Sequence, residues 1–393
     1  MKKSLLAVAA MTAFAGAAQA QSSVTVYGIL DVGFTGADAK AFPASNAAGS
    51  KKTTSAQFGQ SAETTSRLGF KGTEDLGGGM KGFFTAEFQL YPEEDRLSGT
   101  SSSGLINRQT FVGLSKQGLG QAAIGTQYTP IHLAVGATDP GQQNNVVGSI
   151  IYPAKANGVD TSTAAYTIRQ NNAITFATEK FAGFSVKGIY SQKNQDQTQT
   201  GANNTATTYT SGGTNNVQGW GIGADYSWKK LYVTAAYQSF RNETNIAGTT
   251  YVATTNTNDN GTNLNDNQFY GAATYDFGIL KAYVNYINRK GTSTLNSNNY
   301  VKRSGQQIGV RSFITPKVEA WGNIGNGSYK ASGVGEPTAN MNAWQLGTNY
   351  WLSKRTNVYA IYGKSQTSNI TTVAGVTGSA AASQYALGVR HTF

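Results

Sequence analysis

Apolar and polar residues alternate one by one along many short stretches of this chain, and the final stretch shows the pattern most fully. From Ser383 to Phe393, one parity is apolar or aromatic and consists of Tyr385, Leu387, Val389, His391 and Phe393. Because successive side chains point to opposite faces of a strand, this stretch predicts a strand with one apolar face. Its free edge needs a partner, and the strand predicted at 24–34 is placed to close it.

The same alternation recurs along the chain and indicates a sheet of many strands. It is clear at 66–73, 82–90, 220–228, 268–277, 280–289, 307–314, 344–352 and 357–362, and weak at 105–116 and 167–178. Short turns are expected near Gly77, Gly118, Gly183, Lys230, Gly278, Pro316 and Lys354. Long polar segments lie between them at 36–60, 91–104, 128–166, 193–216, 242–266, 291–304, 327–341 and 366–382.

This regular alternation of connections is typical of an antiparallel transmembrane β-barrel, whose long loops face outside and whose short turns face the periplasm. Eight long and seven short connections join sixteen strands. About ten residues at ~3.3 Å each, tilted by ~45°, cover the roughly 25 Å of an apolar membrane band. A soluble β-sandwich is the alternative, but it requires neither matched strand lengths nor a terminal strand that closes the sheet. The predicted fold class is therefore all-β, a barrel of about 16 strands.

Residues 1–20 have the pattern of an export signal. Lys2 and Lys3 precede a short apolar run, and Ala18-Gln19-Ala20 is a small-residue cleavage site. The apolar run is too short for a membrane-spanning anchor. We therefore expect a signal peptide at 1–20 and one barrel domain at 21–393.

Composition agrees with an exported β protein. The chain has 47 glycines, 21 tyrosines, no cysteine and 13% charged residues, a mixture that suits strands and turns. Removing Lys2 and Lys3 from the 31 basic residues leaves 29 against 20 acidic ones, a net charge of +9. Nucleic acid is not an expected partner, because the basic residues are scattered and the protein leaves the cytoplasm.

We find no motif that indicates an enzyme, a metal site or a cofactor site. Gly77-Gly78-Gly79-Met80-Lys81-Gly82 spells a dinucleotide fingerprint, but it joins two strands instead of opening a helix, so a tight hairpin is the better interpretation. His391 lies on the apolar face near the end of the chain. His132 is followed by Asp139 and Ser149, which leaves a Ser-His-Asp arrangement formally open. We predict no enzyme activity and no cofactor.

A set of basic residues falls on the inward face of the predicted strands or at their ends. It consists of Arg67, Lys71, Arg108, Arg169 and Arg311. An arginine that faces lipid near the middle of the bilayer costs about 2–4 kcal/mol, so inward placement is favoured. Guanidinium groups at a narrow waist lower the energy of a passing anion, although any one of them alone could be an ordinary solvated wall charge.

The longest connection, 128–166, differs from the other loops because it is rich in apolar residues. It carries Ile131, Leu133, Val135, Val146, Val147, Ile150 and Ile151, and its only acids are Asp139 and Asp160. A loop folded into the lumen would pack these apolar side chains against the wall and narrow the pore. An extracellular flap packed on itself is the alternative.

Several stretches resemble the general porins of Gram-negative bacteria, specifically their beta-proteobacterial branch. They are S-V-T-V-Y-G-I-L-D at the start of the barrel, S-R-L-G-F-K-G-T-E-D-L-G-G-G-M-K at 66–81, N-R-Q-T-F-V-G-L-S at 107–115, I-G-T-Q-Y-T-P at 124–130 and the terminal Y-A-L-G-V-R-H-T-F. The resemblance implies a sixteen-stranded homotrimeric barrel whose third loop folds inward, with basic wall residues that face acids of that loop. The P-E-F-G-G segment of enteric relatives is absent from this loop.

The resemblance also implies roles for particular residues. Arg67, Arg108 and Arg169 correspond to the basic side of a pore constriction, with Lys71 and Arg311 as further candidates. Asp139 and Asp160 are the candidates for its acidic side, and Glu87 corresponds to a lumen glutamate of the third strand. We predict a passive, water-filled channel for small hydrophilic solutes with a preference for anions. A substrate-specific channel and a surface adhesin remain alternatives.

The partners that we expect follow from this interpretation. They are two further copies of the chain in a homotrimer, outer-membrane lipid and lipopolysaccharide, the outer-membrane assembly machinery, and small hydrophilic solutes and anions. The terminal residues Tyr385, Leu387, Val389, His391 and Phe393 form the expected insertion signal for that machinery.

Overall fold

The structure is a computed structural model that describes residues 23–42, 51–99, 104–154, 156, 165–201, 209–246, 263–332, 338–371 and 377–393. The predicted signal peptide at 1–20 lies outside these residues. The strands are β1 Ser23–Phe42, β2 Lys51–Gln60, β3 Arg67–Gly77, β4 Met80–Gln89, β5 Ile106–Lys116, β6 Gly120–Tyr128, β7 Arg169–Thr178, β8 Phe184–Gly201, β9 Tyr209–Trp228, β10 Leu231–Ile246, β11 Leu264–Asp276, β12 Lys281–Ser293, β13 Tyr300–Phe313, β14 Val318–Ala331, β15 Thr338–Trp351, β16 Thr356–Thr371 and β17 Thr377–Thr392. The helix α2 spans Pro130–Thr138. In the described part of the chain, no helix is both long and apolar enough to cross a membrane.

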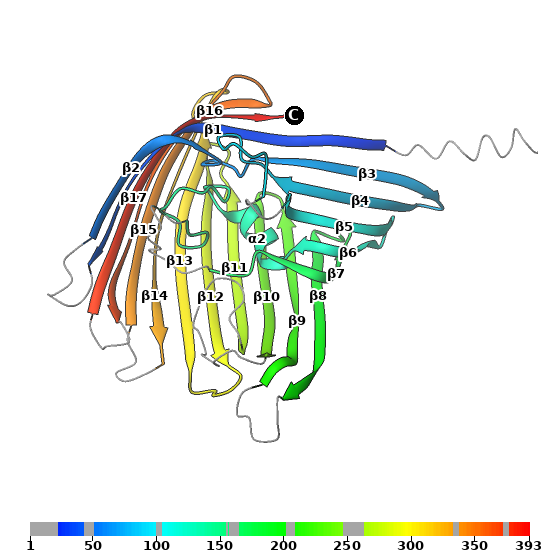
Figure 1. Ribbon diagram of the computed structural model, residues 1–393. Coiled ribbons are helices and arrows are strands. Elements are labelled where there is room, and N and C mark those ends of the chain that lie inside the picture. The colour runs from blue at the N-terminus through cyan, green and yellow to red at the C-terminus, as the bar shows by residue number, and fades with distance from the viewer. Residues whose placement is uncertain are drawn as a thin grey trace, which may run out of the picture.

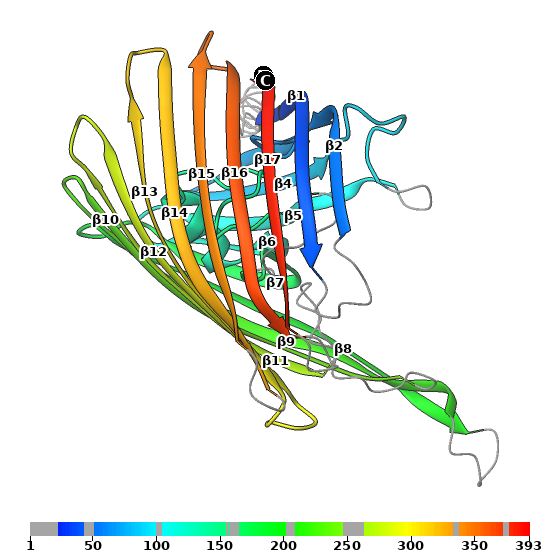
Figure 2. The same cartoon turned by 90° about the vertical axis from the view of Figure 1, so that its left-hand side faces the viewer.

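The strands form one antiparallel sheet that closes on itself (Figure 1). From β3 onward each strand pairs with the next along the chain, and β17 returns to pair with β1. Figure 2 shows β17 between β16 and β1. The backbone N–H groups of Gly28 and Phe393 each donate to the carbonyl of the other at 3.1 Å. The prediction that the terminal stretch closes the sheet against the first strand is confirmed.

One segment adds to the predicted strand count. β1 pairs with β3 through its first part, Ser23 to Ile29, and with β2 through its second part, Val32 to Ala41. β2 is therefore an additional segment beside the sixteen strands of the closed barrel. Residues 61–66 join β2 to β3 where β1 supplies only Leu30 and Asp31, so they bulge from the sheet. We call this segment the 61–66 bulge.

The barrel is apolar outside and polar inside. On β1, Val24, Leu30 and Phe34 are exposed on the outer face, whereas Asp31 is fully buried on the inner one. Near the strand ends, aromatic rings pair on the outside, as in Phe184 with Tyr226 at 4.3 Å between ring centres. This distribution matches a barrel that spans a membrane, with aromatic residues at the interface.

Several segments that we predicted as long loops begin or end with strand residues. The predicted loop boundaries were therefore wrong. β1 continues to Phe42 and β2 begins at Lys51 within the predicted loop 36–60. β8 and β9 likewise continue into 193–216 and reach beyond their neighbours (Figure 2). The alternation of apolar residues stops where the membrane stops, but the backbone hydrogen-bond ladder continues into water.

Other local predictions are confirmed. The weak stretches at 105–116 and 167–178 are β5 and β7. The glycine motif is a hairpin turn between β3 and β4, in which Gly77, Gly78 and Gly79 have φ values of +81°, +58° and +76°. Residues with a Cβ atom rarely adopt positive φ angles, which explains why glycine occupies all three positions.

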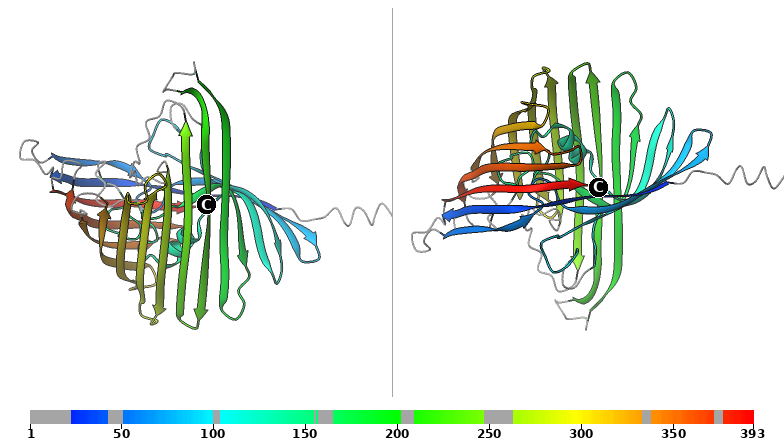
Figure 3. Two further views of the ribbon diagram at one scale, coloured as in Figure 1. Left: turned by 90° about the horizontal axis from the view of Figure 1, so that it is seen from below. Right: turned by 90° about the horizontal axis from the view of Figure 1, so that it is seen from above.

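The longest connection folds into the barrel, and α2 lies among the surrounding strands (Figure 1, Figure 3). Ile131 and Val135 of α2 are fully buried with Tyr270 and Ile287 of the wall. Further along, Val146 is buried against wall residues that include Trp321. For the described part of 128–166, the inward fold is confirmed.

Candidate pore constriction

A row of inward amide side chains fixes the third loop to the wall. We call it the amide row, and it consists of Gln238, Gln268, Asn285, Gln307, Gln345 and Gln384 on β10, β11, β12, β13, β15 and β17. Gln307 Oε1 accepts from Ile150 N at 2.9 Å, and Gln268 Oε1 accepts from Thr167 N at 2.7 Å. Gln345 Nε2 donates to the carbonyls of Val146 and Val147 at 2.8 and 3.1 Å. Each bond satisfies a buried loop group that would otherwise be unpaired.

The loop begins with a well-capped helix. Thr129 precedes α2 and its side chain accepts from His132 N, while Pro130 occupies the first turn, where no backbone donor is needed. Thr138 Oγ1 near the other end lies 2.6 Å from Tyr270 Oη on β11. These contacts orient α2 so that His132 and Tyr128 stack with their ring centres 4.3 Å apart.

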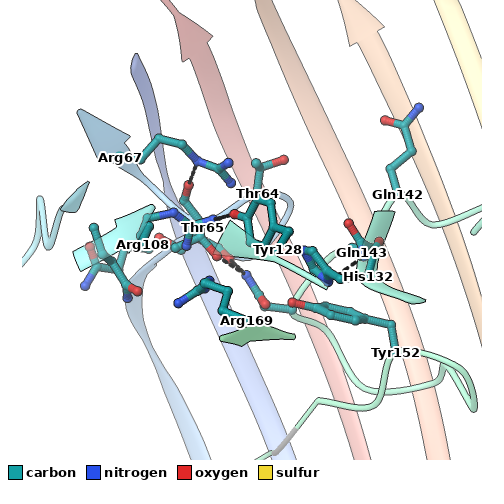
Figure 4. A pocket seen from close by; sticks show the side chains of 14 residues that line it. Thr64, Thr65, Arg67, Arg108, Tyr128, His132, Gln142, Gln143, Tyr152 and Arg169 are labelled. Carbon is teal, nitrogen blue, oxygen red and sulfur yellow. Dashed lines mark hydrogen bonds between the residues drawn. The ribbon is translucent and has the colours of Figure 1, made fainter. Parts of the chain in front are cut away.

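Three arginines from three strands meet beside this stack (Figure 4). We call Arg67, Arg108 and Arg169 the arginine wall. They lie at the starts of β3 and β7 and near the start of β5. Arg108 donates through Nε to Glu87 Oε1 and through Nη2 to Tyr128 Oη, both at 2.8 Å. The Arg169 guanidinium carbon lies 5.5 Å from the centre of the Tyr128 ring.

Arg67 completes the group through weaker contacts. Its Nε donates to Thr65 O of the 61–66 bulge at 2.9 Å, and its Nη1 lies 3.7 Å from Glu87 Oε1. One carboxylate, Glu87, thus serves both Arg67 and Arg108. The sequence prediction that these three arginines converge is matched by their positions, although their functional role stays a prediction.

The arginine wall borders a cavity of about 490 Å³ between the wall, the 61–66 bulge and the third loop. Among the described residues that line this cavity, none is acidic. Three inward arginines elsewhere are each paired with a carboxylate: Arg289 with Asp266, Arg311 with Glu319, and Arg390 with Glu63. Of the arginine wall and these three paired arginines, only the arginine wall carries more positive than negative charge, and it lies at the cavity.

The 61–66 bulge is a part of the constriction that the sequence did not reveal. It is held from behind by Asp31, whose carboxylate accepts from Thr64 N at 2.6 Å and from Tyr359 Oη at 2.6 Å. It meets the third loop where Asn145 Nδ2 donates to Ser61 O at 2.7 Å. The only hint in the sequence that this stretch leaves the sheet was the absence of large apolar residues from 61–66.

The other predicted site residues lie apart from this group. Lys71 is exposed further along β3, with its Nζ 5.3 Å from the centre of the Tyr27 ring. Arg311 pairs with Glu319 and donates to Pro140 O of the loop at 2.7 Å, so it anchors the loop. Neither residue lines the cavity.

The acidic side is where the geometry departs from expectation. Asp139 is buried at the end of α2, where its carboxylate accepts from Gln143 N at 2.7 Å and from Gly141 N at 3.3 Å. Burial raises the pKa of the Asp139 carboxyl, so it is a poor source of negative field. The structure does not place it beside the arginine wall. Asp160 lies outside the described residues.

No Ser-His-Asp arrangement forms among the described residues. His132 Nδ1 lies 3.2 Å from Tyr166 Oη and 3.1 Å from Gln143 Nε2, whereas Ser149 Oγ donates to Gln307. Burial, followed by the charges of Arg169, Arg108 and Arg67, lowers the pKa of His132 to about 3. His391 is exposed at the rim, where its Nδ1 lies 2.9 Å from Thr356 Oγ1.

A closed barrel with an apolar outer face, a polar lumen and a waist narrowed by an inward loop defines an outer-membrane channel of the porin class. Comparison with known proteins gives the family. The family model described as Gram-negative porin matches residues 7–370, and this chain belongs to that family. It is therefore an outer-membrane protein that acts as a general diffusion channel.

Individual relatives agree with this assignment. The chain is 29% identical to an outer membrane porin protein of Bordetella pertussis over 92% of its own length and 94% of the relative's. It is 34% identical to outer membrane porin protein 32 of Delftia acidovorans over 47% of this chain and 48% of that one.

Solved structures share the fold at lower identity. An anion-selective porin from Comamonas acidovorans has a TM-score of 0.65 and 22% identity, with 95% of this chain and 100% of that chain covered. OmpT of Vibrio cholerae, solved in a trimer form, has a TM-score of 0.61 and 14% identity, with 95% and 99% covered.

Proposed function

We propose that this porin conducts small hydrophilic solutes passively and prefers anions, and that the arginine wall sets the preference. The observation that carries the proposal is the charge balance at the cavity, which three guanidinium groups border, while Glu87 pairs with two of them, Arg67 and Arg108. Guanidinium stays charged at any relevant pH, and low-dielectric walls focus its field on the water between. A fixed positive field at the narrowest part of the lumen raises the local concentration of anions and lowers that of cations.

The test is the ratio of anion to cation permeability in planar bilayers, measured for the wild type and for Arg67→Gln combined with Arg169→Gln. We expect the double variant to lose most of its anion preference, because two of the three wall charges are gone. Lys354→Gln combined with Arg355→Gln removes two charges from an exposed periplasmic turn and serves as the matched control, which should behave as the wild type. An unchanged ratio in the double variant would contradict the proposal.

We also propose that three copies of the chain assemble. The trimer form of the Vibrio cholerae OmpT structure supports this assembly by analogy of fold. Light scattering of the purified protein in mild detergent measures the mass of the complex after subtraction of the bound detergent. A mass of one protomer would refute the trimer.

Export and insertion complete the proposal. We expect cleavage after Ala20, which the intact mass of the protein purified from outer membranes would report. We assign no enzymatic chemistry to the barrel, because the buried His132 has neither Ser149 nor Asp139 as a hydrogen-bond partner. Saturable block of the current by one solute would indicate a substrate-specific channel instead.

A further inference from the structure

Asp31 on β1 is the residue around which the 61–66 bulge is built. Its carbonyl oxygen accepts from Ser61 N at 2.8 Å, and its backbone N–H donates to Ser66 Oγ at 3.0 Å. Its carboxylate accepts from Thr64 N through Oδ2 and from Tyr359 Oη of β16 through Oδ1, both at 2.6 Å. Both backbone groups and both carboxylate oxygens of this one residue are therefore engaged, and most of these bonds go to the bulge.

A carboxylate at this position is costly. Asp31 is fully buried, and among the described residues it forms no ion pair. Glu63 of the bulge is a second buried carboxylate, whose Oε2 lies 3.7 Å from Arg390 Nε. Because burying a charge without a counter-ion is unfavourable, stability alone does not explain an aspartate here. A carboxylate does, however, accept at both oxygens and donate at neither, which suits two converging donors.

The bulge needs an anchor because its own backbone is strained. Ser61 at its start has a φ of +60°, a region that residues with a Cβ atom rarely adopt. Ser61 Oγ accepts from Ser66 N at 2.9 Å, so the two ends of the bulge are tied together. Strained conformations persist only where their surroundings determine them, and they cluster at functional sites.

Arg67 of the arginine wall depends on the bulge for its position (Figure 4). Its Nε donates to Thr65 O at 2.9 Å, which is its only hydrogen bond within the part of the chain that the structure describes. Arg108, by contrast, is held by Glu87 and Tyr128 at 2.8 Å each. A displacement of the bulge would therefore move Arg67 and leave Arg108 in place.

We propose that Asp31 and Tyr359 are positioning residues that set the ion selectivity of the pore by fixing where Arg67 lies. Neither of the two lines the cavity. They act through the bulge, because Asp31 holds Thr64 and the next residue, Thr65, holds Arg67. The inference rests on the proposed anion preference, since it concerns the position of one of the charges that produce it.

The charge of Asp31 and its positioning role predict opposite effects. Through space, loss of a negative charge near the lumen favours anions. Through the bulge, Asp31→Asn replaces one acceptor oxygen with a donor, which releases a partner and displaces Arg67 from the waist, so that anions are disfavoured. The sign of the change in the anion-to-cation permeability ratio therefore separates the two roles.

The experiment measures this ratio in planar bilayers for Asp31→Asn, Tyr359→Phe, Arg67→Gln and the combination of each of the first two with Arg67→Gln. We expect Asp31→Asn and Tyr359→Phe to lower the ratio, the former by at least about half of the fall that Arg67→Gln produces. In the Arg67→Gln background neither should lower it further, because the arginine that they position is absent. A purely structural role would not depend on Arg67 in this way.

Asp225→Asn and Tyr232→Phe are the matched controls. Asp225 on β9 is also a buried carboxylate whose Oδ1 accepts from a tyrosine, Tyr232 Oη on β10, at 2.9 Å, but neither residue lines the cavity. Neither control should lower the ratio, and resistance to unfolding in cold SDS confirms that each variant is folded. A ratio that stays the same or rises in Asp31→Asn would overturn the proposal, as would an equal fall with and without Arg67.

A label on the bulge distinguishes failure of this inference from failure of the proposed function. The chain has no cysteine, so Thr65→Cys carries a single spin label, whose mobility is measured by electron paramagnetic resonance. We expect the mobility to rise with Asp31→Asn and to stay the same with Asp225→Asn. An unchanged permeability ratio in Arg67→Gln would contradict the role proposed for the arginine wall. An unchanged label mobility in Asp31→Asn would contradict the positioning role, whatever the ratio does.

Discussion

At the scale of single residues, the net positive charge of the constriction depends on how few carboxylates pair with its arginines. Glu87 is 3% exposed and takes bonds from Arg108 and from Tyr27, so it holds the wall together while neutralising part of it. Charge-assisted bonds of this kind are short and directional. The same residue therefore limits the field and fixes the geometry that produces it.

Glu87→Gln should raise the preference for anions. The amide keeps an oxygen for Arg108 and removes the negative charge with which Arg67 and Arg108 pair. A unit charge about 7 Å from a passing ion in water contributes on the order of 0.6 kcal/mol, with opposite sign for anion and cation, so the anion-to-cation permeability ratio should rise by up to about sevenfold. Bilayer recordings measure it, and Glu319→Gln, whose carboxylate pairs with Arg311 away from the cavity, is the control. A fall in the ratio would show that Glu87 acts only as a scaffold.

His132 gives the folded protein a pH dependence. Its pKa is lowered to about 3 from an ordinary value of 6.5, so between these two values the unfolded chain binds a proton that the folded chain does not. The contribution of His132 to stability is therefore fully present above pH 6.5 and is lost as the pH falls toward 3. We expect the apparent unfolding temperature in detergent to fall less steeply over this range in His132→Asn than in the wild type. Parallel profiles for the two proteins would argue against this assignment.

At the scale of elements, the third loop is held by the wall and not by its own secondary structure. Its helix has nine residues, too few to be stable alone. Apolar side chains of the loop pack against the wall. The amide row supplies the hydrogen bonds that water would supply to the backbone of an exposed loop. The constriction is thus as rigid as the barrel strands that carry the row.

Gln345→Ala should loosen this loop. Gln345 is fully buried and donates to two loop carbonyls, which would lose their partner. Leaving buried acceptors unpaired costs about 1–3 kcal/mol, so the unfolding temperature should drop and open-channel current noise should increase. Gln366→Ala removes an exposed amide from the neighbouring strand β16 and should change neither quantity. Quiet channels in Gln345→Ala would mean that the apolar contacts alone hold the loop.

The sequence revealed most of this element and missed the rest for a physical reason. Ile131, Val146 and Ile151 predicted an inward loop because an exposed loop would leave these apolar side chains in contact with water. The alternation also placed Gln307 and Gln345 on the inward face, but not which backbone atoms they meet, since these pairs join residues far apart in the chain. Asp139 was expected to contribute negative charge to the pore constriction. It is instead buried at the end of α2, where Gln143 and Gln307 donate hydrogen bonds to its carboxylate. Residue spacing in the sequence does not predict these contacts. The strand ends beyond the membrane were missed because both of their faces are polar.

At the scale of the whole molecule, the barrel is closed by its last strand against its first. Phe393 covers Gly28, where an added Cβ would lie 2.3 Å from the ring, so a side chain there would displace the terminal ring. Tyr385 covers Gly36 in the same way. The aromatic positions that we predict as the insertion signal therefore also pack across the closing pair of strands.

Phe393→Ala separates these two roles. If the terminal ring is chiefly an insertion signal, the amount of protein in the outer membrane should fall several-fold, while refolding of the purified chain into detergent stays near the wild-type yield. Phe313→Ala, at an exposed aromatic residue at the end of β13, is the control. Loss of refolding in detergent would show that the ring is needed for closure itself.

The central claim is that the lumen is a water-filled path whose waist carries excess positive charge. The most direct measurement is the zero-current potential of the wild-type protein in a planar bilayer between concentrated and dilute KCl, whose two ions have nearly equal mobility. We predict that the dilute side becomes negative, because chloride crosses more readily, and that the potential shrinks as the mean salt concentration rises and the Debye length falls from about 10 Å at 0.1 M to about 3 Å at 1 M. A dilute side that becomes positive, or a potential near zero at low salt, would contradict the account.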